Sequence, residues 1–270
     1  MKCNDVCDVE VVRVNVADGK FERRKDVVAG EVPLHIFLGQ THYVTILCSP
    51  SMLKELTVGH LFSEGILHSL NEIRELLLEE SGKCIVRFSG GIDVEKRINL
   101  SYPFARLIVS ACGSADYWPL SKLVDRIRGI KIESDVVVEA KTIVESVRCL
   151  GSVAEVFRKT GGVHVASLNY VDGRLVKFAE DVGRHNAVDK VIGAGVLGGV
   201  DFSSCFLALS GRLSGDIVLK AARMGIPVAV SRATALGSGV EVAERLGVCL
   251  VGFVRGDRMN VYACSNRVDF

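Results

Sequence analysis

The second half of the chain alternates short apolar segments with segments of helical spacing, and this alternation limits the possible fold more than any other feature. A buried strand is predicted at 205–210 (CFLALS), followed by a turn and a helix that ends at Gly225. A second buried strand is predicted at 226–231 (IPVAVS), and a helix near 239–246 precedes a third strand at 248–255 (VCLVGFVR). Strands that alternate with helices favour a layered α/β arrangement around a largely parallel sheet.

The first half reads mainly as strands. A helix is predicted between Ser49, as its N-cap, and Gly65, as its stop. Around this helix we predict strands at 11–16, a hairpin at 34–47, and further strands at 84–88 and 98–110. The sequence thus predicts two parts, a β-rich N-terminal part with one helix (1–112) and an α/β domain (113–270).

The composition argues against two broad classes of function. The 270 residues carry a net charge of +1, so there is no strong basic field for a nucleic-acid backbone. The window from Val191 to Gly211 is as long as a membrane span, but its five glycines and central turn indicate a helix end and a buried strand. The amino terminus has acids where a signal peptide needs a basic start. We therefore expect a cytoplasmic protein that binds neither nucleic acid nor membrane.

Nine cysteines are scattered along the chain, and most lie inside apolar runs. An odd, irregular set is typical of small buried hydrophobic residues in a reducing compartment rather than of a disulfide framework. Cys3 and Cys7 are spaced more widely than a C-x-x-C pair and lack a second pair with ligand spacing, so no metal site is expected.

Cys112 differs from most of the others because it follows a predicted strand and precedes Gly113, Ser114 and Ala115. Small neighbours leave a sulfur uncovered. The amides of a helix that starts nearby would favour the thiolate, which is the nucleophilic form. The residues alone leave two interpretations open: a reactive thiol on a loop, or a packing residue.

Polar residues also crowd the start of a helix predicted within AEDVGRHNAVDK (179–190). Arg184, Asn186 and the helix-start amides are suited to hold a phosphate or a heterocycle. His185 and Asp189 lie one turn apart, so the carboxylate is expected to orient the imidazole. A polar helix face with i,i+4 pairs is the competing interpretation.

Two turns that follow predicted strands carry arginine. The segment from Ser210 to Arg212 joins a strand to a helix and aims backbone N–H groups at an anion, although it lacks the P-loop signature. Arg255 and Arg258 flank a glycine turn in GFVRGDRMNVY, which is also the pattern of a plain hairpin. His164, in TGGVHVASL, alternates with valines and is interpreted as a core or strand-end histidine.

Taken together and in this order, several segments closely resemble the FdhD family of formate dehydrogenase accessory sulfurtransferases. They are GHLFSEGI, ACG, TGGVHVASL, EDVGRHNAVDKVIG, SGRLSGDIVLKAARMGIPVAVSR and GFVRGDRMNVY. The resemblance spans about residues 30 to 263. It implies an α/β (α+β) fold, with a cytidine-deaminase-like layered α/β/α domain and an additional β-rich N-terminal part, and it implies a homodimer.

The resemblance also implies a function. Such a protein moves persulfide sulfur from a cysteine desulfurase to the molybdenum, or tungsten, of bis(molybdopterin guanine dinucleotide), Mo-bis-MGD, which formate dehydrogenase requires. Cys112 is the implied persulfide carrier, and a guanine nucleotide is expected to fit the cofactor site. The implied cofactor contacts are Phe253, Val254, Arg255, Gly256, Asp257 and Arg258. We expect Arg184, His185, Asn186, Ser210 and Arg212 to complete the pocket.

Two departures narrow the implied chemistry. Many family members have C-x-x-C at this loop, whereas this chain has CGSA with Ala115 in the second position, so no resolving thiol is expected. His164 is followed by Val165 and Ala166 rather than by the H-x-E of zinc deaminases, and P-C-x-x-C does not occur, so deamination is disfavoured.

Two alternatives remain beside sulfur transfer. One is a chaperone that inserts a nucleotide-bearing cofactor without sulfur chemistry, which the missing second cysteine keeps open. The other is a thiol–disulfide oxidoreductase, which the CGSA sequence disfavours.

Overall fold

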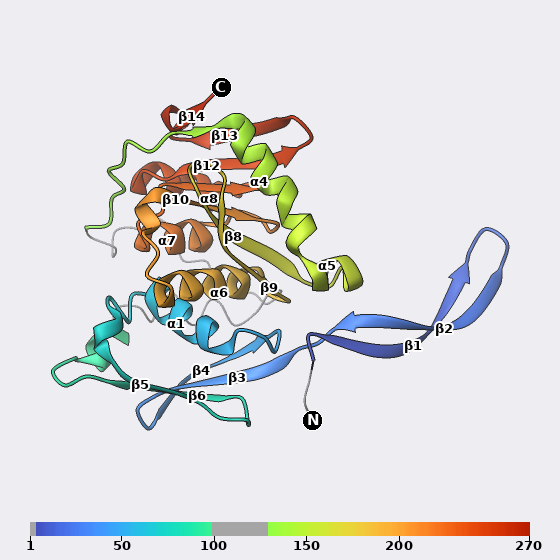
Figure 1. Ribbon diagram of the computed structural model, residues 1–270, viewed down its shortest axis with the longest axis horizontal. Coiled ribbons are helices and arrows are strands. Elements are labelled where there is room, and N and C mark those ends of the chain that lie inside the picture. The colour runs from blue at the N-terminus through green and yellow to red at the C-terminus, as the bar shows by residue number, and fades with distance from the viewer. Residues whose placement is uncertain (1–3, 99–128) are drawn as a thin grey trace.

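The computed structural model describes residues 4–98 and 129–270, and its centre is a six-stranded sheet (Figure 1). The strand order is β13-β12-β11-β10-β8-β9. Strands β10, β11 and β12 run parallel, while β8, β9 and β13 run antiparallel to their neighbours. The bounds are β8 His164–Tyr170, β9 Leu175–Asp181, β10 Cys205–Leu209, β11 Val228–Ser231, β12 Cys249–Arg255 and β13 Arg258–Ala263.

Helices cover both faces of this sheet, which explains why every residue of β10 and β11 is buried. Phe206 and Ala208 pack toward α4 (Ala140–Val153), in a core that also contains Ile143 and Val147. The alternate residues, such as Leu207, belong to the core of the opposite face. The helices of that face are α6 (Arg184–Leu197), α7 (Gly215–Arg223) and α8 (Gly237–Leu246).

The N-terminal part contributes a second, four-stranded sheet of order β4-β3-β6-β5. Helix α1 (Leu53–Ser63) joins it to the rest of the protein, because buried residues of α1, of this sheet and of α6 share one continuous core. The strands are β3 Val32–Leu38, β4 Thr41–Cys48, β5 Ile73–Leu78 and β6 Lys83–Phe88. Short elements complete the described chain: α5 Glu155–Thr160, the pair β7 Val138–Glu139 and β14 Val268–Asp269, and 3-10 helices at Leu70–Glu72, Phe202–Ser204 and Ser265–Arg267.

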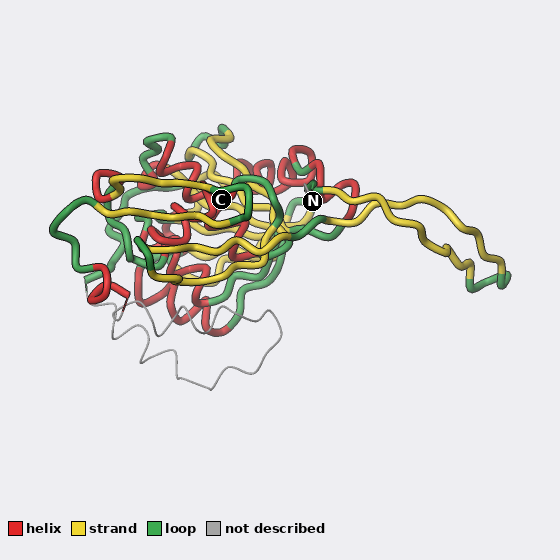
Figure 2. Tube along the Cα trace, turned by 90° about the horizontal axis from the view of Figure 1, so that it is seen from below, coloured by secondary structure: helices red, strands yellow, loops and turns green. Residues whose placement is uncertain are grey.

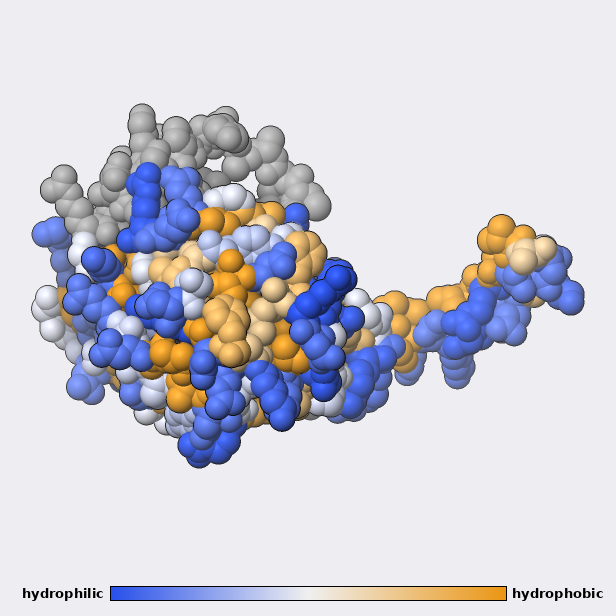
Figure 3. All heavy atoms as spheres, turned by 90° about the horizontal axis from the view of Figure 1, so that it is seen from above, coloured by the Kyte–Doolittle hydropathy of each residue, from blue (hydrophilic) through white to orange (hydrophobic). Residues whose placement is uncertain are grey.

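A hairpin of β1 (Val6–Asn15) and β2 (Lys20–Ala29) projects from the body as an arm (Figure 2). The two strands pair only with one another, in a two-stranded sheet. Side chains near the tip are exposed, and apolar residues follow the length of the arm (Figure 3).

Helices α1 and α6 cross at glycines. A Cβ atom placed on Gly59 would lie 1.7 Å from the carbonyl oxygen of Asp189, and one placed on Gly193 would lie 1.8 Å from that of Glu55. Each backbone therefore occupies the space that a side chain would need on the other helix.

Buried charges lie beside this crossing. The Lys220 ammonium of α7 is 2.7 Å from Glu64 Oε1 and 2.9 Å from Asp189 Oδ1. Asp189 also accepts a hydrogen bond from Ser63 at 2.7 Å and lies 3.1 Å from His60 Nδ1. Burial acts to raise the pKa of Asp189, but the charge of Lys220 and these hydrogen bonds outweigh it and lower the pKa to about 2. The network ties α1, α6 and α7 together.

The structure confirms most of the strands and helices predicted in the second half, and the hairpin at 34–47. It corrects the start of the first helix: Met52, with φ 57°, stands at the N-cap, and Ser49 instead binds the β9 end, where its hydroxyl accepts from Val182 N–H at 3.2 Å. The strand predicted at 98–110 lies outside the described residues except for Ile98, which is helical. The boundary predicted after residue 112 also lies outside them.

The window that begins at Val191 is split between α6 and β10, as predicted. Within the described ranges, no helix has both the length and the apolar character needed to cross a bilayer.

We predict that Gly193→Ala destabilises the protein strongly. The added methyl group meets backbone rather than a flexible side chain, so the helices must separate, and we expect the free energy of unfolding to fall by ~2 kcal/mol or more. Gly151→Ala in α4 is the matched control, because its Cβ would meet no atom within 4 Å. That control should stabilise the protein by about 1 kcal/mol at most. Urea unfolding followed by circular dichroism measures both; equal stabilities would contradict the packing argument.

Candidate functional site

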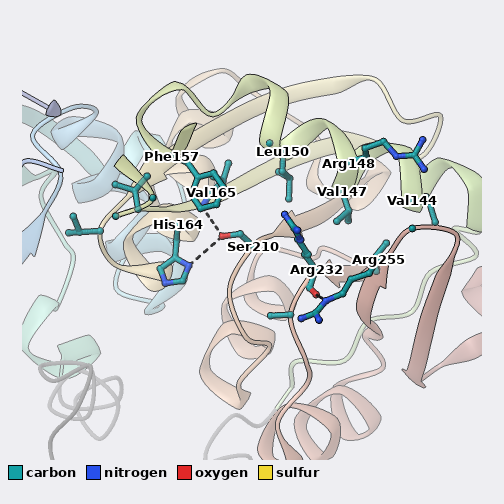
Figure 4. A pocket seen from close by; sticks show the side chains of 18 residues that line it. Val144, Val147, Arg148, Leu150, Phe157, His164, Val165, Ser210, Arg232 and Arg255 are labelled. Carbon is teal, nitrogen blue, oxygen red and sulfur yellow. Dashed lines mark hydrogen bonds between the residues drawn. The ribbon is translucent and has the colours of Figure 1, made fainter. Parts of the chain in front are cut away.

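The carboxyl ends of β10, β11 and β12 meet at one edge of the sheet, and a cavity of about 770 Å³ lies at this edge (Figure 4). In open α/β sheets, ligands bind at the carboxyl ends of the strands. Ser210 follows β10, Arg232 and Ala233 follow β11, and Arg255 ends β12. Helix α4 and the glycines that lead into β8 close the other side.

The lining has two chemically different sides. One is apolar and is formed by Val144, Val147, Leu150, Phe157, Val163, Val165, Val182 and Val254. The other is polar and cationic and is formed by Arg148, His164, Ser210, Arg232 and Arg255. No acidic side chain is among the described residues that line the cavity. Such a lining suits a ligand that is planar and apolar at one end and anionic at the other.

Contacts with neighbouring residues position Arg255. Its Nε donates a hydrogen bond to the carbonyl oxygen of Arg232 at 3.1 Å, and its guanidinium lies over the Phe253 ring, 5.2 Å from the ring centre. Phe253 has a left-handed backbone, with φ 52°, and its N–H donates to Ala233 O at 2.8 Å. This local bend lets the side chain of Arg255 reach the end of β11.

The other residues of the predicted 253–258 segment divide between two hollows. Val254 and Gly256 line the main cavity together with Arg255. Phe253 and Arg258 line a smaller neighbouring cavity of about 300 Å³, which Arg255 and Asn260 also border. Asp257, the remaining residue of the segment, lies 3.4 Å from Arg148, which lines the main cavity.

The 180–190 cluster is mostly directed elsewhere. Asn186 donates hydrogen bonds to Leu47 O and to Asp181 Oδ1, both at 2.9 Å, and Lys190 lies 2.7 Å from Asp181. These buried contacts connect β9 to β4 and to the chain just after it. Asn186 is therefore not among the residues that line the cavity.

The expectation that Asp189 orients His185 is wrong. Asp189 faces His60 and Lys220, and His185 instead pairs with Asp216 of α7. Burial, the largest single effect, acts to raise the pKa of Asp216, but the hydrogen bond and charge of His185 outweigh it and hold the pKa of this carboxyl well below its usual range.

Arg184 and Arg212 lie near the cavity without lining it. Arg184 packs beside Gly211, where an added Cβ would lie 2.9 Å from its own Cβ. The Arg212 side chain is exposed. Both charges nevertheless act on His164, which does line the cavity.

His164, interpreted from the sequence as a core or strand-end histidine, is the first residue of β8 and lines the cavity. Ser210 Oγ accepts a hydrogen bond from Val165 N–H at 3.0 Å and lies 3.3 Å from His164 Nδ1 (Figure 4). Burial and the charges of Arg184 and His185 lower the pKa of His164. Arg148 and Arg232 were also missed. A signal was present for Arg232, which follows its buried strand as Ser210 follows β10.

Most of the described cysteines are buried, as predicted from their apolar surroundings. Cys48, Cys84, Cys205 and Cys249 are buried, and burial raises the pKa of each thiol, to about 12 for Cys48 and Cys249. Cys149 is exposed. The predicted persulfide carrier, Cys112, lies outside the described residues.

Comparisons with known proteins agree with the resemblance. The profile described as the FdhD/NarQ family matches residues 29–269. The sulfur carrier protein FdhD of Sulfolobus acidocaldarius is 35% identical over 255 residues, which cover 94% of this chain and 96% of the relative. That of Bacillus pumilus is 32% identical over 254 residues, which cover 93% of this chain and 94% of the relative.

A solved structure shows the same fold. A crystal structure described as that of a formate dehydrogenase accessory protein from Desulfotalea psychrophila has a TM-score of 0.77 and 28% sequence identity, and the match covers 97% of this chain and 99% of that chain. The mixed α/β arrangement predicted from the sequence is confirmed.

We predict that Asp216→Asn removes a stability increment that depends on pH. Because the pKa of Asp216 is lower in the folded protein, its contribution is fully present above about pH 3.9, the ordinary aspartate value, and is lost as the pH falls through the folded pKa. At pH 7 the free energy of unfolding of the variant should be about 1–3 kcal/mol lower than that of the parent protein. Urea unfolding at pH 7, 5 and 3 measures the difference, which should narrow at the lowest pH. The exposed Asp257→Asn should change little at any pH.

Proposed function

The chain belongs to the FdhD/NarQ family, and on that premise we propose that it is a sulfur carrier that serves the maturation of formate dehydrogenase. The curated relatives are named as sulfur carriers, and the similar crystal structure is described as a formate dehydrogenase accessory protein. The observation that carries the proposal is the two-sided cavity at the carboxyl edge of the sheet. It offers a site for a nucleotide-bearing substrate in a chain of this family.

In the proposed reaction, the Cys112 thiolate attacks the outer sulfur of a persulfide on a cysteine desulfurase. The bond between the two donor sulfurs breaks, the donor leaves as a thiolate, and a persulfide forms on Cys112. In the second transfer the bond between the two sulfurs of the Cys112 persulfide breaks. Cys112 is released as a thiolate and the outer sulfur passes to the acceptor, which supplies the two electrons that convert this sulfur to sulfide. Neither transfer needs a second cysteine, which accords with Ala115 in the CGSA loop.

The described cysteines support Cys112 as the carrier. A carrier thiol must ionise and be reached by large partners. Four of the described thiols are buried with raised pKa values, so they remain protonated at neutral pH. Cys149 is exposed, so it is the matched control variant for Cys112.

The proposed sulfur acceptor is the metal of Mo-bis-MGD or its tungsten form, which this protein handles as a substrate. The cavity volume of about 770 Å³ falls in the usual range for small-molecule sites and suits one nucleotide-sized portion of that substrate. Arg232 and Arg255 would hold a diphosphate, and the apolar side would cover a planar heterocycle. Arg258, in the neighbouring hollow, extends the cationic surface.

The proposed partners are a cysteine desulfurase, formate dehydrogenase and a second copy of the chain, and the proposed location is the cytoplasm. The arm supports the homodimer. Directly opposite residues of an antiparallel pair share a face, so Val14 and Phe21 lie together, and they are 57% and 73% exposed. An isolated two-stranded hairpin is only marginally stable in water, which favours a partner over this face.

The charge of the arm fits a second copy better than a strongly charged partner. From Val6 to Ala29 it carries equal numbers of basic and acidic side chains: Arg13, Lys20, Arg23, Arg24 and Lys25 against Asp8, Glu10, Asp18, Glu22 and Asp26. A neutral, mixed surface can pair with itself about a two-fold axis.

We predict that Cys112→Ala abolishes sulfur transfer while leaving the fold and the cavity intact. After incubation with a cysteine desulfurase and cysteine, mass spectrometry should find ~32 Da of added sulfur on the Cys112 peptide of the parent protein, the mark of a persulfide. Cys149→Ala is the control and should remain fully loaded. Formate dehydrogenase activation in cells should fall at least ~100-fold with Cys112→Ala.

The same experiment separates the chaperone alternative. Activation that survives Cys112→Ala but is lost with Arg258→Ala would refute sulfur transfer and favour cofactor insertion alone.

A second prediction concerns the arm. Val14→Lys should shift the protein toward single chains, because it places a charge in the exposed apolar pair of Val14 and Phe21. Glu22→Gln changes the charge by the same amount on the opposite face, beside Arg13, and should keep the parent's oligomeric state. Light scattering after size-exclusion chromatography measures the mass; identical masses for the two variants would refute the role of this face.

A further inference from the structure

His164 occupies a special position on the polar side of the cavity. It is the first residue of β8, directly opposite Asp181 in β9, and it lines the cavity beside Ser210. The hydroxyl of Ser210 already accepts from Val165 N–H at 3.0 Å. Its proton is then available to His164 Nδ1, 3.3 Å away. Ser210 thus holds one edge of the imidazole ring within hydrogen-bond distance and positions the ring at the cavity wall.

Charged groups face His164 from several elements. Arg184 and His185 belong to the start of α6, Arg212 follows β10, and Asp181 ends β9. The single carboxylate among them is already used, because Asp181 accepts from Ser49 N–H at 3.0 Å and Gly183 N–H at 2.8 Å and pairs with Lys190 at 2.7 Å.

The environment of His164 favours the neutral ring. Burial is the largest cause of its lowered pKa, and the positive neighbours Arg184, His185 and Arg212 add to it. An anion placed against the ring would reverse this balance, because a negative charge within a few ångströms favours the imidazolium form.

We propose that His164 contacts the phosphate portion of the ligand in this cavity and takes up a proton as that ligand binds. The ligand class is a phosphate or diphosphate ester, since the same side of the cavity carries Arg148, Arg232 and Arg255 and the opposite side is apolar. This inference rests on the proposed role of the cavity as a nucleotide site, and it assigns to His164 a part that the arginines cannot play. Arginine stays charged at any physiological pH, whereas histidine couples binding to a proton.

The coupling has a definite sign. The pKa of His164 is higher in the complex than in the free protein, so between these two values binding takes up a proton. Affinity for the phosphate ester should rise as the pH falls through the pKa of the complex, and it should level off below the pKa of the free protein. Release of the ligand is correspondingly favoured at higher pH.

The test is calorimetric titration of the full chain with guanosine diphosphate at one pH, in two buffers with different heats of ionisation. The difference in observed heat gives the number of protons taken up, which we expect to lie between about 0.3 and 1 near neutral pH, given the ordinary histidine pKa. With His164→Gln the uptake should vanish and the affinity should fall ~10-fold. His42→Gln, on the exposed part of β4, is the control and should match the parent in both.

A second variant, His164→Asn, keeps the test informative if His164→Gln does not fold. In His164→Asn the side-chain amide can donate to Ser210 or accept from it, but no proton can be taken up. Circular dichroism identifies the folded variants, and loss of proton uptake in either folded variant supports the inference. Guanosine, which has no phosphate, should bind without proton uptake.

Two outcomes overturn the inference: binding of guanosine diphosphate to the parent without proton uptake, or full uptake retained by a folded His164 variant. Failure of the parent to bind guanosine diphosphate at all would instead count against the proposed nucleotide site. Titration with inorganic pyrophosphate then tests the role of His164 separately from the nucleotide site. Binding of pyrophosphate with proton uptake supports the inference, and binding without proton uptake refutes it.

Discussion

The contact between α1 and α6 is the constraint on which the rest of the structure depends. Gly59 and Gly193 allow the two backbones to touch, and beside them the buried carboxylates of Glu64 and Asp189 share the ammonium of Lys220. Arg223 adds a second positive charge 3.8 Å from Glu64. Removing one member of such a network leaves an uncompensated buried charge, at a cost of about 3–5 kcal/mol. Because these groups come from both halves of the chain, the four-stranded and six-stranded sheets are held in one body around a shared core.

That packing positions the cavity at the carboxyl edge of the larger sheet. With α6 and α7 fixed on one face, α4 covers the other, and the chain must leave β10, β11 and β12 at the same edge. Each exit contributes a polar residue, Ser210, Arg232 or Arg255, although these positions are far apart in sequence. The apolar side comes largely from α4, whose inward face otherwise belongs to the core. The site is thus a consequence of sheet topology more than of any single motif.

The sequence predicted the elements better than it predicted the contacts between them. An apolar segment such as 205–209 is buried whichever element packs against it. The alternation of strands and helices in the second half could therefore be predicted from the sequence. The partner of a polar side chain depends on packing between distant elements. His185 was therefore paired with Asp189, its neighbour by helical spacing, whereas the fold brings it to Asp216. In the same way, Asn186 was predicted to bind a cofactor but connects β9 to the N-terminal sheet. Ser210 was predicted to face an anion because it directly follows a buried strand, whereas Arg255 was assigned to the cofactor site by the family resemblance. Both line the cavity.

The distribution of charge in the cavity fits a carrier that must release what it binds. A chain with a net charge of +1 concentrates arginines at one site, and with no carboxylate among the described lining residues that site favours anions strongly. Fixed charges alone would favour retention of a diphosphate as much as its capture. A neutral imidazole among them lowers the charge of the empty site and makes part of the attraction conditional on a proton. In the proposed coupling, capture and release then differ by one proton at His164, without any change in the fold that α1 and α6 hold together.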